Sequence, residues 1–300
     1  MTEAAASMGS MAQFGLTANA SGNADHQFEV LRCGLAKHGT LVEAAGLRGT
    51  RSHHKDNVQN GPYTVGGPVV FEPRPDDLIQ LLPFCLGAAA NGNTYAVAET
   101  LPAAIIQVDK VAKVFTYAGM KVDKWEFACG GPGQNLRLTI DWEGLTEATG
   151  NAGSFPSIGN TLSTLQPYVF HQGVFTAGNT AYPINQHSLR GDNALVKDRH
   201  NNSQTRSQLP EADRLITFEC TCPLTSDEIG LYDLSVAGLA ATLVYTNGNR
   251  SVTFTLANMK LATESPTVES RTAEITWPLR FSVFADGNTK EIVVTNVNTA

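Results

Sequence analysis

Apolar and polar residues alternate along much of the chain, most clearly between residues 121 and 143. Trp125, Phe127 and Cys129 fall on one face, and a glycine-rich turn follows at residues 130–133. The returning segment places four apolar residues on the same face: Leu136, Leu138, Ile140 and Trp142. Because side chains alternate along a strand, this pattern predicts an antiparallel hairpin. The residues in between are polar and of mixed charge, so its second face is expected to be wet.

Alternation of the same kind predicts further strands in the rest of the chain. They are expected at residues 63–71, 94–98, 103–108, 111–117, 168–176, 216–222, 243–245, 252–256, 275–283 and 291–295. The Asn247-Gly248 pair predicts a tight hairpin turn. Residues 286–288 predict a second turn, so the last two strands are expected to pair with each other. That plan matches the hairpin at residues 121–143 and is weak evidence of an internal duplication.

One helix is expected to begin at Pro75. Proline suits the first turn of a helix, and Asp76 and Asp77 complement its dipole. Its apolar stripe consists of Leu78, Leu81, Leu82 and Cys85. The helix should end near Gly87, and Pro83 is expected to kink or shorten it.

Two segments are too polar to belong to a core. Residues 1–25 are small and polar, and are expected to form a flexible arm, or an extended segment that orders only against a neighbour, before a single β domain at residues 26–300. Residues 185–208 are longer than most connections and are expected to form a projecting loop or a loop that a partner orders. The charged candidates for contacts in this loop are Arg190, Asp192, Lys197, Asp198, Arg199 and Arg206.

Composition narrows the function classes. The chain has 42% hydrophobic and 16% charged residues, enough apolar surface for a packed core, and a formal net charge of −7. That charge argues against a protein that holds nucleic acid by its phosphates. Its five cysteines are odd in number and lack zinc-ribbon spacing, which favours reduced thiols in a cytoplasmic setting. The first residues lack the features of a secretory signal, and no apolar run approaches transmembrane length.

Catalytic and metal-binding patterns are not found in the sequence. The seven histidines form no HExxH motif, and Cys220 and Cys222 share a strand face without a second pair of ligands. Residues 155–159 lack the first glycine of a serine elbow. Asp141 and Glu143 share a strand face, as glycosidase carboxylates could, but their polar neighbours favour a solvated wall. We therefore expect no enzyme activity, no cofactor and no metal.

The three tryptophans each lie on the apolar face of an expected strand. Trp125, Trp142 and Trp277 are therefore expected to anchor the core or an interface.

Several blocks of residues, in order, resemble the tail tube proteins of bacteriophages with long, non-contractile tails. The first three blocks are residues 46–51 (GLRGTR), residues 71–75 (FEPRP) leading to 81–87 (LLPFCLG), and residues 114–122 (VFTYAGMKV). A fourth runs from Tyr168 through Gly173 and Asn193 to Asp213 and Arg214. Together they span about residues 40–295. No single residue acts as a signature, so a related tube-like ring, such as a tail completion or secretion-system ring protein, stays open as an alternative.

The resemblance implies a mainly β subunit, an antiparallel β-sandwich or barrel-like fold with one short flanking helix. Such subunits assemble with themselves into hexameric rings that stack into a tube and conduct DNA into the host. Six copies of −7 would give a formal charge of −42 per ring, which lets DNA slide without being held. The loop at residues 185–208 and the N-terminal arm would then make contacts between rings.

The resemblance also implies partners and a location. The partners are the tape measure and tail terminator proteins, with genome DNA passing unbound and with no membrane. The location is the virion tail, assembled in the host cytoplasm. Two other function classes stay open: a β-sandwich module that binds glycan or a host surface, which would need exposed aromatic residues, and an enzyme on a β scaffold, which would need a catalytic set.

Overall fold

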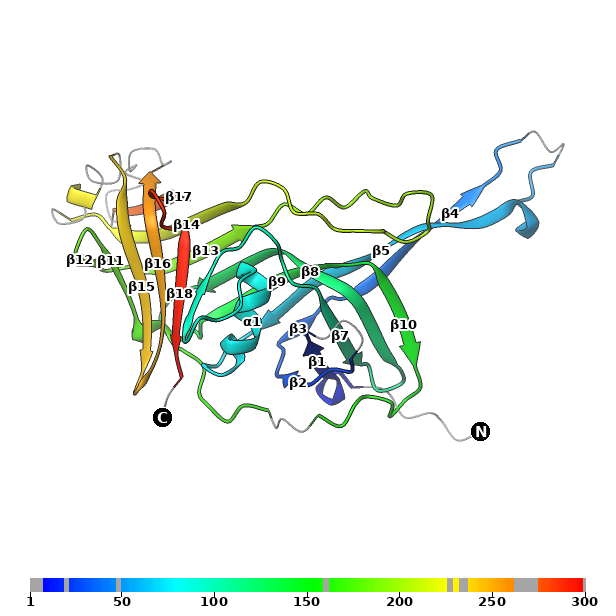
Figure 1. The fold of residues 1–300 in the computed structure, drawn as a ribbon, viewed down its shortest axis with the longest axis horizontal. Helices are drawn as coiled ribbons and strands as arrows, with labels where there is room; N and C mark the ends of the chain where they lie inside the picture. Colours follow the sequence, from blue (N-terminus) through cyan, green and yellow to red (C-terminus); the bar gives the residue numbers. More distant parts are fainter. Residues whose placement is uncertain are drawn as a thin grey trace.

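The computed structural model describes residues 8–18, 22–46, 50–158, 162–225, 229–231, 237–261 and 275–298. Strands dominate this part of the chain (Figure 1). They are β1 (Gln13–Thr17), β2 (His26–Phe28), β3 (Arg32–Cys33), β4 (Ala36–Glu43), β5 (Val58–Phe71), β6 (Thr94–Ala96), β7 (Ala104–Asp109), β8 (Val114–Cys129), β9 (Arg137–Gly144), β10 (Thr146–Gly150), β11 (Gly173–Ala177), β12 (Thr180–Tyr182), β13 (Gln186–Asp192), β14 (Leu215–Pro223), β15 (Leu239–Asn247), β16 (Arg250–Leu261), β17 (Thr276–Phe284) and β18 (Ile292–Val297). The helical elements include α1 (Asp77–Leu86) and the short 3₁₀ turns η1 (Gly9–Met11), η2 (Lys55–Asn57) and η3 (Phe170–Gln172). Residues 229–231 and 237 are also helical.

Two antiparallel layers enclose the main core. One layer runs in the order β5, β9, β8, β13, β14, β17, and the other runs β12, β11, β15, β16, β18, β6. Strand β16 also pairs with β17, so the two layers are continuous. Aromatic rings meet between the layers, with centroids 4.8 Å apart for Phe127 and Phe254 and 4.9 Å apart for Phe175 and Phe218. The prediction of a mainly β, antiparallel sandwich with one short helix is confirmed.

A smaller sheet shares its longest strand with the main one. It runs β2, β1, β7, β8, β10, and it uses only the first half of β8. The second half of β8 pairs with β9 and β13. The register of β8 shifts near Gly119, which has a φ of 65°, and a second shift occurs at Asp123. Such bulges bend a strand, and here they turn β8 from one sheet into the other.

The N-terminal segment is more ordered than its composition predicts. Residues 13–17 form β1, which pairs with both β2 and β7, and Phe14 and Leu16 are buried in the core. The prediction of a flexible arm at residues 1–25 is therefore wrong for this strand, while residues 1–7 and 19–21 lie outside the described part. The sequence pattern does not predict β1 because its two buried apolar residues, Phe14 and Leu16, are surrounded by small and polar residues.

Helix α1 begins at Asp77 and not at Pro75. The side chain of Asp76 caps it by accepting a hydrogen bond from the backbone N–H of Asp77. Pro83 does not end the helix, because it costs one backbone hydrogen bond while the apolar stripe stays packed against the sheet. Gly87, with φ of 92°, closes the last turn by donating to the carbonyl of Pro83 at 2.8 Å.

The last two strands do not form the predicted hairpin. In the described part of the chain both pair with β16: residues 281–284 of β17 lie opposite residues 258–261, and β18 lies opposite residues 251–256. The two strands therefore run in the same direction along one edge of β16. The turn at residues 286–288 belongs to a loop that leaves this edge and returns to it, so the proposed internal duplication has no structural counterpart. The hairpins at residues 121–143 and around Gly248 are confirmed.

The core contains all three tryptophans and most of the cysteines. Trp125, Trp142 and Trp277 are buried. All five cysteines are free thiols, and four of them are buried. The sulfur atoms of Cys220 and Cys222 lie 3.9 Å apart on one face of β14.

The core also contains a histidine. His187 on β13 is 4% exposed, its Nε2 lies against the hydroxyl of Tyr245, and its ring stacks on Phe218. Burial lowers the pKa of His187 to about 4, well below the ordinary value of about 6.5. The folded protein therefore keeps this ring neutral over a range in which the unfolded chain takes up a proton.

This difference predicts a loss of stability in acid. Because the pKa of His187 is lower in the folded state, stability falls as the pH drops from about 6.5 to about 4, by about 3 kcal/mol in all. Burial raises the pKa of Asp77 to about 6, which acts in the opposite direction, so the test compares variants. Urea unfolding against pH should show the acid loss weakened in His187→Phe and kept in His38→Gln, a change at an exposed site. Equal pH slopes for wild type and His187→Phe would contradict it.

Candidate assembly surfaces

The most exposed element is a long hairpin that leaves the body of the molecule (Figure 1). We call residues 36–63 the arm: within it β4 pairs with the first half of β5, from Gly39 opposite Tyr63 to Glu43 opposite Val58. Its apolar residues Leu41 and Val42 are 71% and 56% exposed. A two-stranded hairpin without a packed face is marginally stable in water. The arm is therefore held mainly by the continuation of β5 into the sandwich.

Local contacts fix the arm near its base. A register shift lies between Gly39 and Leu41, and the hydroxyl of Thr40 there donates to the carbonyl of Pro62 at 2.9 Å. The ammonium of Lys37 sits 4.0 Å from the ring centroid of Tyr63, a cation–π contact. Polar groups thus occupy both faces of the arm, which leaves its backbone edges and exposed apolar side chains for other contacts.

The predicted loop at residues 185–208 is in part a strand. Residues 186–192 form β13, which pairs with β8 on one side and β14 on the other. The buried face of β13 carries His187, Leu189 and Gly191, and a Cβ on Gly191 would lie 2.2 Å from the ring of Trp125. A histidine and a glycine occupy two of these inward positions in place of large apolar residues, so the sequence shows no apolar alternation there and predicts a polar loop.

Two of the predicted contact residues belong to this strand. Arg190 and Asp192 lie on the wet face, where the Nε of Arg190 is 2.9 Å from Glu126 and Asp192 is 2.9 Å from Lys124. Further ion pairs on this face join Glu219 to Arg190 and Arg280, and Arg137 to Glu72. Exposed pairs of this kind contribute about 0–1 kcal/mol each. Because of these pairs, each of these lysine and arginine side chains has a carboxylate as its neighbour.

The irregular remainder, residues 193–214, connects β13 to β14 along the chain and lies against β8 and β9 of the sandwich. We call it the strap. It is fastened at Asp123, the bulged residue of β8, which is 3% exposed. The Nζ of Lys197 is 2.6 Å from Asp123, and the backbone N–H of Leu195 donates to the same carboxylate at 3.0 Å. A buried carboxylate needs such partners, because its desolvation is otherwise costly.

A second fastening point lies at Glu143 on β9. One oxygen of Glu143 is 3.1 Å from Lys197, and the other is 2.6 Å from Arg206, which is 6% exposed. Burial lowers the pKa of Lys197, but hydrogen bonds to Asp123 and Glu143 outweigh it and raise that pKa overall. The predicted solvated wall is therefore wrong at Glu143, because the strap covers this end of the face.

The remaining predicted residues of the strap are exposed. Asp198 lies at the surface, and Arg199 donates to the side chain of Gln208 at 3.1 Å. The strap also has apolar contacts of its own, in a small cluster of Leu195, Leu209 and Leu101.

The tip of the strap reaches the base of the arm, as the yellow-green loop in Figure 1 shows. The carbonyl of Gln204 accepts a hydrogen bond from the backbone N–H of Tyr63 at 2.9 Å, and its side-chain amide donates to the carbonyl of Asn60 at 2.9 Å. Strand β9 ends at Gly144, opposite Val65. The strap therefore takes over the edge of β5 where β9 stops.

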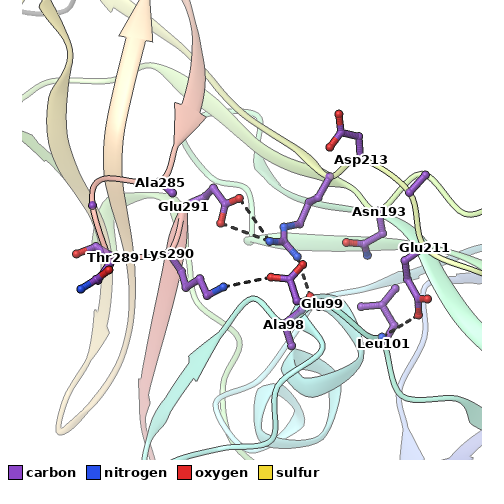
Figure 2. Close-up of a pocket in the computed structure, with 14 residues that line it drawn as sticks. Ala98, Glu99, Leu101, Asn193, Glu211, Asp213, Ala285, Thr289, Lys290 and Glu291 are labelled. Carbon is purple, nitrogen blue, oxygen red and sulfur yellow. Dashed lines mark hydrogen bonds and ion pairs between the residues drawn. The ribbon is translucent and has the colours of Figure 1, made fainter.

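A polar pocket of about 430 Å³ opens beside the other end of the strap (Figure 2). It lies between residues 98–101, 211–214 and 285–291. Figure 2 shows Lys290 and Glu99 pointing toward each other, 3.2 Å apart, and Glu291 is 3.4 Å from Arg214. No group of three or more potential metal ligands occurs in the described part of the chain.

Sequence reasoning missed the arm, Asp123 and the covered position of Glu143. The arm carries no clean alternation because both of its faces are wet. The sequence carries one sign of the bulge. Counting back from Trp125, Asp123 is polar where an apolar residue is expected and Val122 is apolar where a polar one is expected, and both are buried. Among the described residues, no helix has the length and apolarity to cross a membrane.

No curated protein matches the chain. The family of phage tail tube proteins matches residues 3–279, which is nearly the whole chain. This chain belongs to the phage tail tube protein family and is a structural protein of the virion tail.

Proposed function

We propose that six copies of this chain close into a ring, and that the rings stack to form the tail tube of a phage with a long, non-contractile tail. The DNA would pass through the lumen of this tube into the host at infection. The tape measure and tail terminator proteins would be its partners, and assembly would take place in the host cytoplasm without a membrane.

The arm is the observation that carries this proposal. It extends well beyond the sandwich, lacks a core and exposes Leu41 and Val42. Such a hairpin gains stability when a second surface covers it. In a stacked tube each subunit has neighbours within its ring and in the next ring, and these neighbours could cover the arm.

Open sheet edges support ring closure. Within the described residues, β12 pairs only with β11, and β10 pairs only with β8. Unpaired edges invite uncontrolled association, and closed rings remove this hazard by pairing the edge of each subunit with the next.

The charges support a conduit rather than a DNA-binding surface. The chain has a formal net charge of −7, and the cations of the wet face lie next to carboxylates. A surface that grips DNA needs free lysine or arginine for the phosphates. If the wet face lines the lumen, DNA could slide along it with little retention.

Electron microscopy of the purified protein over a concentration series, beside size-exclusion chromatography, tests this proposal. We expect rings at low concentration and hollow tubes at higher concentration, with six-fold symmetry in end views. Rings of another symmetry would contradict the subunit number. A protein that stays monomeric at every concentration, and also when tail tips are added as seeds, would contradict self-assembly.

A further inference from the structure

We infer that Arg206 is a positioning residue: it fastens the strap to the sandwich and, through the strap, sets the direction of the arm. The inference about arm direction stands on the contacts of a single subunit. Its consequence for tube assembly rests on the proposed function.

Arg206 holds the strap above the base of the arm. Its guanidinium is buried and lies 2.6 Å from Glu143, while its Nε has no hydrogen-bond partner in the described structure. Glu143 pairs with Gly66 of β5, and a Cβ at Gly66 would lie 3.1 Å from the Glu143 carboxylate. The absence of a side chain at Gly66 thus lets the ion pair sit directly over β5, close to where β5 enters the arm.

The strap is stiff enough to transmit this position. Its two legs are joined by hydrogen bonds from Val196 to Pro210 and from Ser207 to Arg199, both 2.8 Å long. Leu195 and Leu209 pack with Leu101 beneath them. Once Arg206 is fixed, the tip two residues away has little freedom.

The tip then pairs with the arm on the edge that β9 leaves open. Gln204 bonds the backbone of Tyr63 and of Asn60, so the strap acts as a third strand at this point. A hairpin that is paired on one edge is restrained in the plane of its sheet. Without the strap, the two strands of the arm could swing about the last residues that β9 holds.

The test is hydrogen exchange in dilute, unassembled protein, followed by mass spectrometry of peptides that cover residues 58–66. Arg206→Ala should raise the exchange rate at Tyr63 about tenfold, which corresponds to the loss of about one hydrogen bond. Arg206→Lys should raise it less, because the charge remains while the fork geometry is lost. Gln204→Ala removes the bond to Asn60 without touching the buried ion pair, and should raise exchange at residues 60–63 alone.

Arg214→Ala is the matched control. Arg214 is also a partly buried arginine of the strap, it pairs with Glu291, and it lies at the end away from the arm. Its loss should leave exchange at residues 58–66 as in the wild type. Unchanged exchange at Tyr63 in Arg206→Ala, or an equal rise in Arg214→Ala, would overturn the inference.

Microscopy of the same variants separates this inference from the proposed function. If the wild type forms tubes, Arg206→Ala should form fewer and shorter ones than Arg214→Ala. If the wild type forms none, self-assembly is contradicted, while the exchange result still decides whether Arg206 positions the arm.

Discussion

Replacing Trp142 by alanine is expected to lower the free energy of unfolding by about 3–5 kcal/mol, the usual cost of truncating a fully buried tryptophan. The Trp142 side chain is 0% exposed and packs against Phe84 of α1, with ring centroids 5.8 Å apart. It therefore joins the helix to the sheet. Its buried Nε1 has no hydrogen-bond partner within the described structure, so the loss is one of packing alone.

Urea unfolding followed by circular dichroism measures this effect. Phe284→Ala is the control, because that aromatic side chain at the end of β17 is 48% exposed. It should cost less than about 1 kcal/mol. A loss below about 1 kcal/mol for Trp142→Ala would mean that the helix and the sheet are not joined through this side chain.

Shortening the arm is expected to abolish tube formation and to leave the sandwich intact. Leu41 lies opposite Asn60, so residues 42–59 can be replaced by Asn-Gly, a two-residue turn that suits a hairpin. The described residues that the deletion removes are exposed or half-exposed, and both strap contacts at Asn60 and Tyr63 are kept. Because no core residue is lost, the free energy of unfolding should change by less than about 1 kcal/mol.

Negative-stain microscopy and urea unfolding of the shortened protein measure the two parts of this prediction. Normal tubes would show that the arm is dispensable, and a large loss of stability would show that it belongs to the folding core. Deleting the strap is a poorer test. It would remove the cations Lys197 and Arg206 and at the same time uncover Asp123, Glu143 and the sheet around them, so misfolding and lost assembly could not be told apart.

The parts of the fold that the sequence predicted are those in which one face is apolar. The pattern predicts the hairpin at residues 121–143 because the side chains on its inward face from Trp125 onward are apolar and most of those on its outward face are polar. Strand β13 was missed because His187 and Gly191 occupy its inward positions, where a hydrogen bond to Tyr245 and the ring of Trp125 make up for the missing apolar volume. Alternation detects hydrophobic volume, and it fails where tertiary contacts supply that volume instead.

The candidate surfaces were harder to predict for a related reason. The arm has no buried face, so nothing in its own sequence distinguishes it from a loop. The fastening of the strap depends on Asp123 and Glu143, which come together with Lys197 only in three dimensions. The turn at residues 286–288 led to the wrong prediction of a hairpin between the last two strands. The local sequence of a turn does not show whether the next strand pairs with the preceding one or, as here, with the same edge of β16.

The long strand β8 has a consequence for how the subunit comes apart. Its first half pairs with β7 and β10 in the smaller sheet, and its second half pairs with β9 and β13 in the sandwich. One sheet cannot melt without fraying a strand that the other still needs. The two sheets should therefore lose structure in a single cooperative transition, which leaves this tail tube subunit no state in which one sheet is melted and the other intact.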